Sequence, residues 1–111
     1  SGYDASRLQM LLAIVGKRAG VKVNDHDVYV NVVGGLKVSE KAADLAVAAA
    51  IMSAMANKVV PANTVVVGEL GLGGEVRNVP FLDRRLKEAD RLGLTAAITP
   101  KTVKSIAELL K

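Results

Sequence analysis

The fold is decided by residues 27–56, which read DVYVNVVGGLKVSEKAADLAVAAAIMSAMA. In residues 28–33 valines alternate with a tyrosine and an asparagine, and this period of two predicts a half-buried strand. The glycines at 34 and 35 predict a turn after it. Ser39 then offers a side-chain cap, so a helix is expected over about residues 40–57.

That predicted helix is apolar on every side. Alanines fill the gaps between its larger apolar side chains, which are Leu45, Val47, Ile51, Met52 and Met55. A helix without a polar face is expected to be buried all round, and small residues let neighbouring backbones come close. We therefore predict that this alanine-rich helix is the central packing element of the domain.

The other expected elements follow from periodicity and turn residues. Ser6 and Gln9 resemble a capping box for a helix over residues 6–20. Further along, we expect a strand over 64–67, a hairpin over 68–76 that turns at Gly73 and Gly74, a helix over 81–92, a strand over 95–99 and a helix over 102–110. Because helices and strands alternate, the predicted class is α/β (α+β), a mixed β-sheet packed with helices.

Composition bounds the function without deciding it. The 111 residues suit a single domain over 1–111, with half the residues apolar. The net charge is +4, and residues 56–111 carry nine Lys/Arg against six Asp/Glu. This excess is modest for a nucleic-acid binder. The absence of cysteine excludes disulfides and thiolate metal sites and suits the cytoplasm, and no apolar run is long enough to predict a membrane partner.

Several sites are rejected on their residues. The Gly16-Lys17 pair is followed by Arg18, so it is not a phosphate-binding loop. Val76 occupies the third glycine site of a dinucleotide fingerprint, which favours a tight hairpin instead. The lone histidine, His26, lies between two aspartates in a polar turn, and no further ligands at known spacing support a metal site.

Three segments carry a specific resemblance. DVYVNVVGGLKV (27–38) leading into AADLA (42–46), VGELGLGGEVR (67–77), and the chain start SRL (6–8) with GKRAG (16–20) resemble the C-terminal domain of the bacterial DNA repair family RadA, also called Sms. That domain is similar to the proteolytic domain of Lon, so the resemblance implies a Lon-protease-like fold. It also implies that the chain is an excised C-terminal domain of a larger parent with a zinc-binding region and a RecA-like ATPase domain. ATP and zinc would belong to those other parts, so no cofactor is expected in this domain.

The same resemblance implies a role without catalysis. RadA proteins form hexameric rings on DNA and promote branch migration during recombinational repair. In the Lon framework the nucleophilic serine falls on Ala42 and its activating lysine on Asp83. Alanine cannot attack, and an ionised aspartate would repel a developing alkoxide. We expect a non-catalytic scaffold that contacts duplex DNA without sequence preference. The alternatives are a pure assembly module and, least favoured, a residual Ser-Lys peptidase.

The expected DNA surface is on the helix over residues 81–92. Leu82, Leu86 and Ala89 share one face, and Arg84, Lys87 and Arg91 share the opposite one. This basic stripe suits phosphates, although a solvated face with local ion pairs to Glu88 has the same pattern. Further candidates for the DNA surface are Arg77, Lys37 and Lys41. No aromatic stacking platform is predicted, so the expected contacts are to the DNA backbone.

Two charges are expected inside the apolar framework. Asp44 falls on the buried side of the central helix, and Arg85 falls beside the apolar face of the helix over 81–92. Buried charges need partners. We predict a structural ion pair between Asp44 and either Arg85 or Arg7, in place of the lost dyad.

Overall fold

The computed structural model describes residues 4–20, 41–56 and 59–110. Predictions on other positions lie outside the described residues, namely the strand over 28–33, its glycine turn, the Ser39 cap, His26 and Lys37. The helices are α1 (Ala5–Arg18), α2 (Asp44–Ala56) and α3 (Leu82–Arg91), with 3₁₀ turns η2 (Lys41–Ala43) and η3 (Ile106–Leu110). The strands are β1 (Thr64–Val66), β2 (Glu69–Leu70), β3 (Val76–Arg77) and β4 (Ala96–Ile98). The fold is mixed α/β, as predicted.

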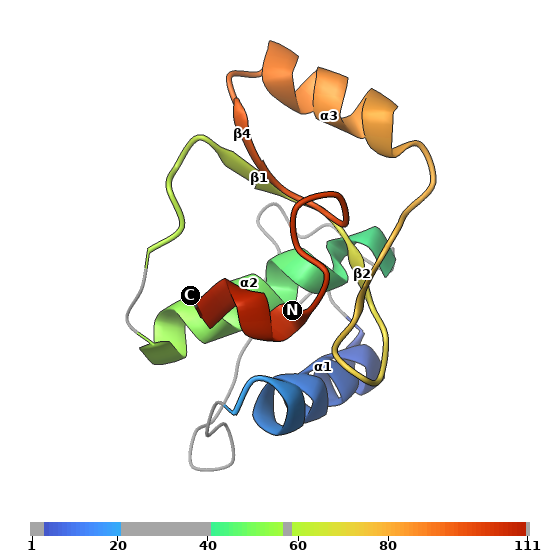
Figure 1. The fold of residues 1–111 in the computed structure, drawn as a ribbon, viewed down its shortest axis with the longest axis vertical. Coiled ribbons are helices and arrows are strands. Elements are labelled where there is room, and N and C mark those ends of the chain that lie inside the picture. The colour runs from blue at the N-terminus through green and yellow to red at the C-terminus, as the bar shows by residue number, and fades with distance from the viewer. Residues whose placement is uncertain (1–3, 21–40, 57–58, 111) are drawn as a thin grey trace.

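Two small sheets organise the second half of the chain. β1 pairs in parallel with β4, in a register that places Thr64 opposite Ala96 and Val66 opposite Ile98. β2 and β3 form the predicted antiparallel hairpin. Because parallel strands need a long crossover, the connection from β1 to β4 carries both the hairpin and α3. Figure 1 shows α3 beyond the β1–β4 pair, at the other end of the molecule from α1.

The main core forms where α1, α2 and η3 meet (Figure 1). Its buried side chains come from all three described segments and are Leu11, Ile14, Val15, Leu45, Ala48, Met52, Leu70, Val76 and Ile106. Five of them, Leu11, Val15, Leu45, Ala48 and Ile106, are inaccessible to solvent. The core is aliphatic, in keeping with a chain of only three aromatic residues.

The hairpin is held against both α1 and η3 through Gly74. This glycine has a φ of 84°, a left-handed conformation that favours glycine. A Cβ at this position would stand 2.8 Å from the Cβ of Arg18 and 3.1 Å from the Cγ2 of Ile106. The Gly74 carbonyl also accepts from the Ile106 N–H at 2.8 Å. The close approach of these three segments therefore requires glycine.

Two helix ends differ from the prediction. Asp4, not Ser6, caps α1: its Oδ1 accepts from the N–H groups of Ser6 at 2.8 Å and Arg7 at 3.2 Å. The helix predicted over 102–110 is wrong in its first half, and only η3 is helical. Its start is delayed because the Val76 N–H donates to the Lys104 carbonyl and Ser105 forms an antiparallel bridge with Glu75. The backbone before Ile106 is thus used in pairing with the hairpin.

Helix α2 is central but not buried all round. Asp44, Leu45, Ala48, Ala49, Ile51 and Met52 are buried, whereas Ala50, Ala54 and Ala56 are exposed. The uniformly apolar sequence concealed this asymmetry because alanine is tolerated on either face. The larger side chains of the helix occupy its inner side.

Candidate functional site

Helix α3 begins at an unusual residue. Phe81, its N-cap, has a φ of 60° and a ψ of 33°, the left-handed region, and makes no side-chain capping bond. The phenylalanine side chain is 65% exposed. From there the helix places Leu82 and Ala89 inward, as predicted, with Leu86 half-buried. The helix ends where the Leu94 N–H donates back to the Ala89 carbonyl at 2.9 Å, with Gly93 at a φ of 90°.

The predicted basic stripe of α3 is exposed, but its three cations are not equivalent. Arg91 Nε donates to Glu88 Oε2 at 3.1 Å, and this bond raises the pKa of Arg91 and lowers that of Glu88. The local ion-pair interpretation therefore describes Arg91. Arg84 and Lys87 form no ion pair with a carboxylate within residues 4–20, 41–56 and 59–110. These two cations are the part of the stripe available to an outside anion.

The two positions that the Lon resemblance assigns to the dyad lie at the edge of one apolar cluster. Ala42 is 8% exposed and packs with Val79 and Leu82. Asp83, which follows Leu82 in the sequence, points outward, and its Oδ1 accepts from the Lys101 Nζ at 2.7 Å. The hydrogen bond from Lys101 and its charge lower the pKa of the Asp83 carboxyl, so this group is ionised at neutral pH. A methyl group and a paired carboxylate thus occupy these positions.

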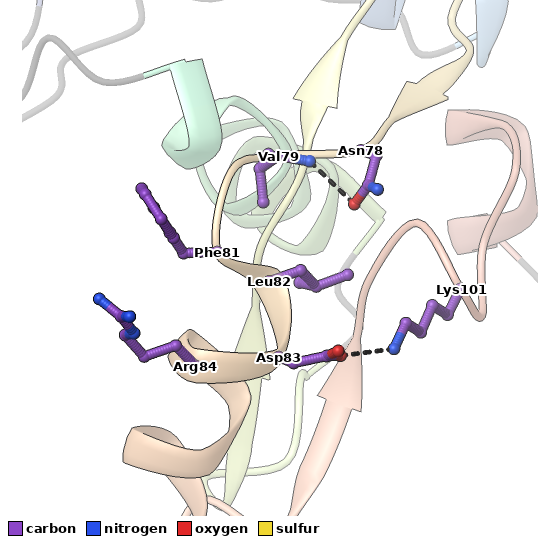
Figure 2. A pocket seen from close by; sticks show the side chains of 7 residues that line it. All are labelled: Asn78, Val79, Phe81, Leu82, Asp83, Arg84 and Lys101. Atoms are coloured by element: carbon purple, nitrogen blue, oxygen red, sulfur yellow. Dashed lines mark hydrogen bonds and ion pairs between the residues drawn. The ribbon is translucent and has the colours of Figure 1, made fainter.

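A shallow pocket of about 420 Å³ opens at the start of α3. It is lined by Asn78, Val79, Phe81, Leu82, Asp83, Arg84 and Lys101. Figure 2 shows Phe81 and Arg84 extending to one side of the helix start, and the Asp83–Lys101 pair on the other. The guanidinium carbon of Arg84 lies 5.2 Å from the centroid of the Phe81 ring. Sequence reasoning missed this pair, although Phe81 is one of three aromatics and falls outside the apolar stripe of the helix.

Asp44 forms the predicted kind of ion pair, and its partner is Arg7. The fully buried carboxylate accepts from Arg7 Nε at 2.6 Å through Oδ1 and from a second guanidinium nitrogen of Arg7 through Oδ2. Oδ2 also accepts from the Leu70 N–H at 3.2 Å. One carboxylate therefore joins α1, α2 and β2. The other expected partner, Arg85, donates from Nε to the Pro80 carbonyl at 2.8 Å.

The remaining candidates are dispersed over the surface. Lys41 Nζ lies 4.0 Å from a Glu69 carboxylate oxygen, and Arg77 lies 3.5 Å from one of Glu75. Both cations are more than half exposed. Lys41 and Arg77 are therefore already close to carboxylates, which makes them weaker candidates for phosphate contact than Arg84 and Lys87.

The described residues also bear on metal binding and on membrane insertion. Among them, no group of three or more His, Cys, Asp or Glu side chains is arranged to hold a metal ion. No helix in those same segments combines the length and the apolar character needed to cross a membrane.

Comparison with known proteins places the chain in a family. Residues 5–103 match the family model described as subunit ChlI of Mg-chelatase, and the chain belongs to that family. Its relatives include the DNA repair protein RadA of Aquifex aeolicus, which is 50% identical over 102 residues, 92% of this chain and 23% of that protein. The RadA proteins of Chlamydia pneumoniae and Mycolicibacterium smegmatis are 46% and 42% identical, over 91% and 100% of this chain and 22% and 24% of those proteins.

The resemblance to RadA that the sequence motifs indicate is therefore confirmed. The chain spans less than a quarter of the length of these relatives. Over this span it is similar to one part of each of these DNA repair proteins.

Proposed function

We propose that this chain is a non-catalytic domain of a RadA-type recombinational repair protein that contacts the backbone of duplex DNA without sequence preference. The observation that carries the proposal is the exposure of Arg84 and Lys87 on α3, neither of which forms an ion pair within the described segments, in a relative of DNA repair proteins. Arg84 and Lys87 project away from the buried Leu82 and Ala89. Cations presented in this way contact phosphates and do not read bases.

The residues at the Lon-type dyad positions support the absence of proteolysis. Acyl transfer needs an oxygen or sulfur nucleophile and a base beside it. Ala42 supplies neither atom, and its side chain is packed against Val79 and Leu82. At the other position, Asp83 is engaged by Lys101. We propose that the Lon-like framework serves here as a scaffold.

The assembly role is the second candidate, and exposed apolar side chains support it. Leu72 at the hairpin tip is 71% exposed and Leu92 after α3 is 64% exposed, and such residues suit contacts between subunits. In the proposed parent, this domain would belong to a hexameric ring in the cytoplasm. ATP and zinc would bind to other domains of that parent. Because a ring would form with or without DNA contact, oligomer mass alone does not separate the two functions.

The test is fluorescence anisotropy of a labelled 30-base-pair duplex at several salt concentrations. The double variant Arg84→Gln/Lys87→Gln removes two positive charges from α3. We expect it to weaken duplex binding about tenfold at low salt. The slope of log affinity against log salt should become less steep by roughly 2, about one for each lost phosphate contact.

A matched control changes the net charge by the same amount elsewhere. Lys17→Glu also removes two units of positive charge, from α1 at the other end of the molecule (Figure 1). We expect this variant to bind the duplex nearly as well as the native chain. Equal weakening by both variants would mean that net charge and not the α3 face governs binding. No duplex binding by the native chain at low salt would leave the assembly role.

A further inference from the structure

Phe81 combines two unfavourable features. A bulky side chain in the left-handed region strains the backbone, and such outliers persist mainly where the surroundings or a function require them. The ring is also 65% exposed, so burial repays little of this cost. An exposed, strained aromatic residue at the rim of a pocket indicates that a ligand contacts the ring itself.

One cation of α3 lies over this ring and a second follows it along the helix. The Arg84 guanidinium lies over it at 5.2 Å, and Lys87 follows on the exposed side of the next helical turn. The one carboxylate that lines the pocket, Asp83, is paired with Lys101 and extends to the opposite side (Figure 2). The aromatic side of the pocket therefore combines an apolar face with the Arg84 cation.

We propose that Phe81 and Arg84 form a stacking site for one unpaired base of single-stranded DNA. The base would lie against the exposed part of the Phe81 ring, while Arg84 and Lys87 contact the flanking phosphates. Aromatic faces interleaved with cations bind single strands because every base has a flat π-face and every linkage a charge. This inference rests on the proposed function, since it uses the same cations, and it adds a preference for unpaired bases.

Charge complementarity favours a nucleic acid over a second copy of this chain. A contact between copies centred on Phe81 would bury the Arg84 guanidinium, which has no carboxylate partner among the described residues. A phosphate linkage supplies that partner. In a duplex the bases are stacked on each other, so only an unpaired or extruded base can reach the ring.

The experiment compares three labelled DNA molecules by fluorescence anisotropy. They are a 15-nucleotide thymidine strand, the same strand with abasic sites throughout, and a duplex of matched length. Phe81→Asn removes the ring and keeps a residue that tolerates the left-handed conformation and caps helices well. Phe81→Tyr keeps the ring.

The expected results separate stacking from charge. Phe81→Asn should weaken binding of the thymidine strand by about 5- to 150-fold, the range for loss of one stacked base. It should leave duplex binding unchanged, and Phe81→Tyr should bind all three molecules as the native chain does. The native chain should bind the abasic strand about as weakly as Phe81→Asn binds the thymidine strand.

Each other outcome overturns the inference. If Phe81→Asn binds the thymidine strand normally while Arg84→Gln/Lys87→Gln loses the duplex, base stacking is refuted and the proposed backbone contact stands. If neither set of variants changes binding, both fail. A change only in sedimentation mass would assign Phe81 to a contact between copies. The abasic comparison uses the native chain alone, so equal affinity for both strands refutes stacking even if Phe81→Asn does not fold.

Discussion

Loss of one partner of the Asp44–Arg7 ion pair is expected to destabilise the fold strongly. Replacing Asp44 by alanine leaves the Arg7 guanidinium and the Leu70 N–H without their shared acceptor. Breaking a fully buried ion pair from one side costs about 3–5 kcal/mol. Because the Arg7 side chain is 19% exposed and can regain some water, we expect the loss to fall at the lower end, about 3 kcal/mol.

The assay is urea unfolding followed by far-UV circular dichroism. With a urea m-value of about 1.5 kcal/mol per molar, a loss of about 3 kcal/mol lowers the midpoint by about 2 M. Asp90→Ala is the matched control, because Asp90 is an exposed helical aspartate and its removal should leave the midpoint unchanged.

A second variant tests the cause. In Asp44→Leu/Arg7→Met both charges are replaced by apolar groups, so neither buried charge is left alone. We expect this pair to recover most of the stability lost in Asp44→Ala. The reasoning is refuted if Asp44→Ala shifts the midpoint no more than Asp90→Ala does, or if the apolar pair is as unstable as the single variant.

Three further predictions concern the hairpin and the core. Gly74→Ala should lower the free energy of unfolding by about 2 kcal/mol or more, and by more than Gly93→Ala does. Both glycines have a positive φ, but of the two only Gly74 has neighbours that a Cβ would strike. Equal losses of stability in thermal unfolding would exclude the packing contribution. Ile106→Ala should destabilise by about 2–5 kcal/mol, measured by urea unfolding, because this fully buried side chain joins η3 to the core. The pKa of the Glu75 carboxyl is lowered from 4.5 by hydrogen bonds from the backbone N–H of Glu75 itself and then from that of Gly73. The ionised carboxylate therefore stabilises the fold above pH 4.5, and this stabilisation is lost as the pH falls through the lowered pKa. Glu75→Gln should therefore reduce the melting temperature at pH 7 but not at a pH below the lowered pKa of Glu75. The same difference in melting temperature between the variant and the native chain at every pH would contradict this.

Much of the second half of the fold could be predicted from local sequence. The run of β-branched residues before Gly68, the glycines of the hairpin and the apolar spacing of Leu82, Leu86 and Ala89 each mark one element by a local rule, and β1, the hairpin and α3 lie where expected. The helix predicted from residue 102 was wrong because its first residues pair with the hairpin across 30 positions of sequence. No local pattern reports that competition.

The candidate site was predictable in its charges and not in its geometry. Spacing alone placed Arg84 and Lys87 on the outer face of α3. The left-handed conformation of Phe81 is set by how the chain turns from the hairpin into α3, and a phenylalanine carries no sequence signal for it. The buried ion pair was predicted for Asp44, but the choice of Arg7 depends on how α1 packs on α2.

The parallel pairing of β1 with β4 has a consequence for local opening. Thr64 and Ala96 are opposite each other, so the hairpin and α3 belong to one closed segment whose two ends meet at this short pairing. Separating the two strands would remove one attachment of the basic helix, whose Leu82 also packs with Ala42 and Val79, while α1 and α2 remain packed on each other. Amide hydrogens of β1 and β4 should therefore exchange together, as one cooperative unit distinct from that of α1 and α2.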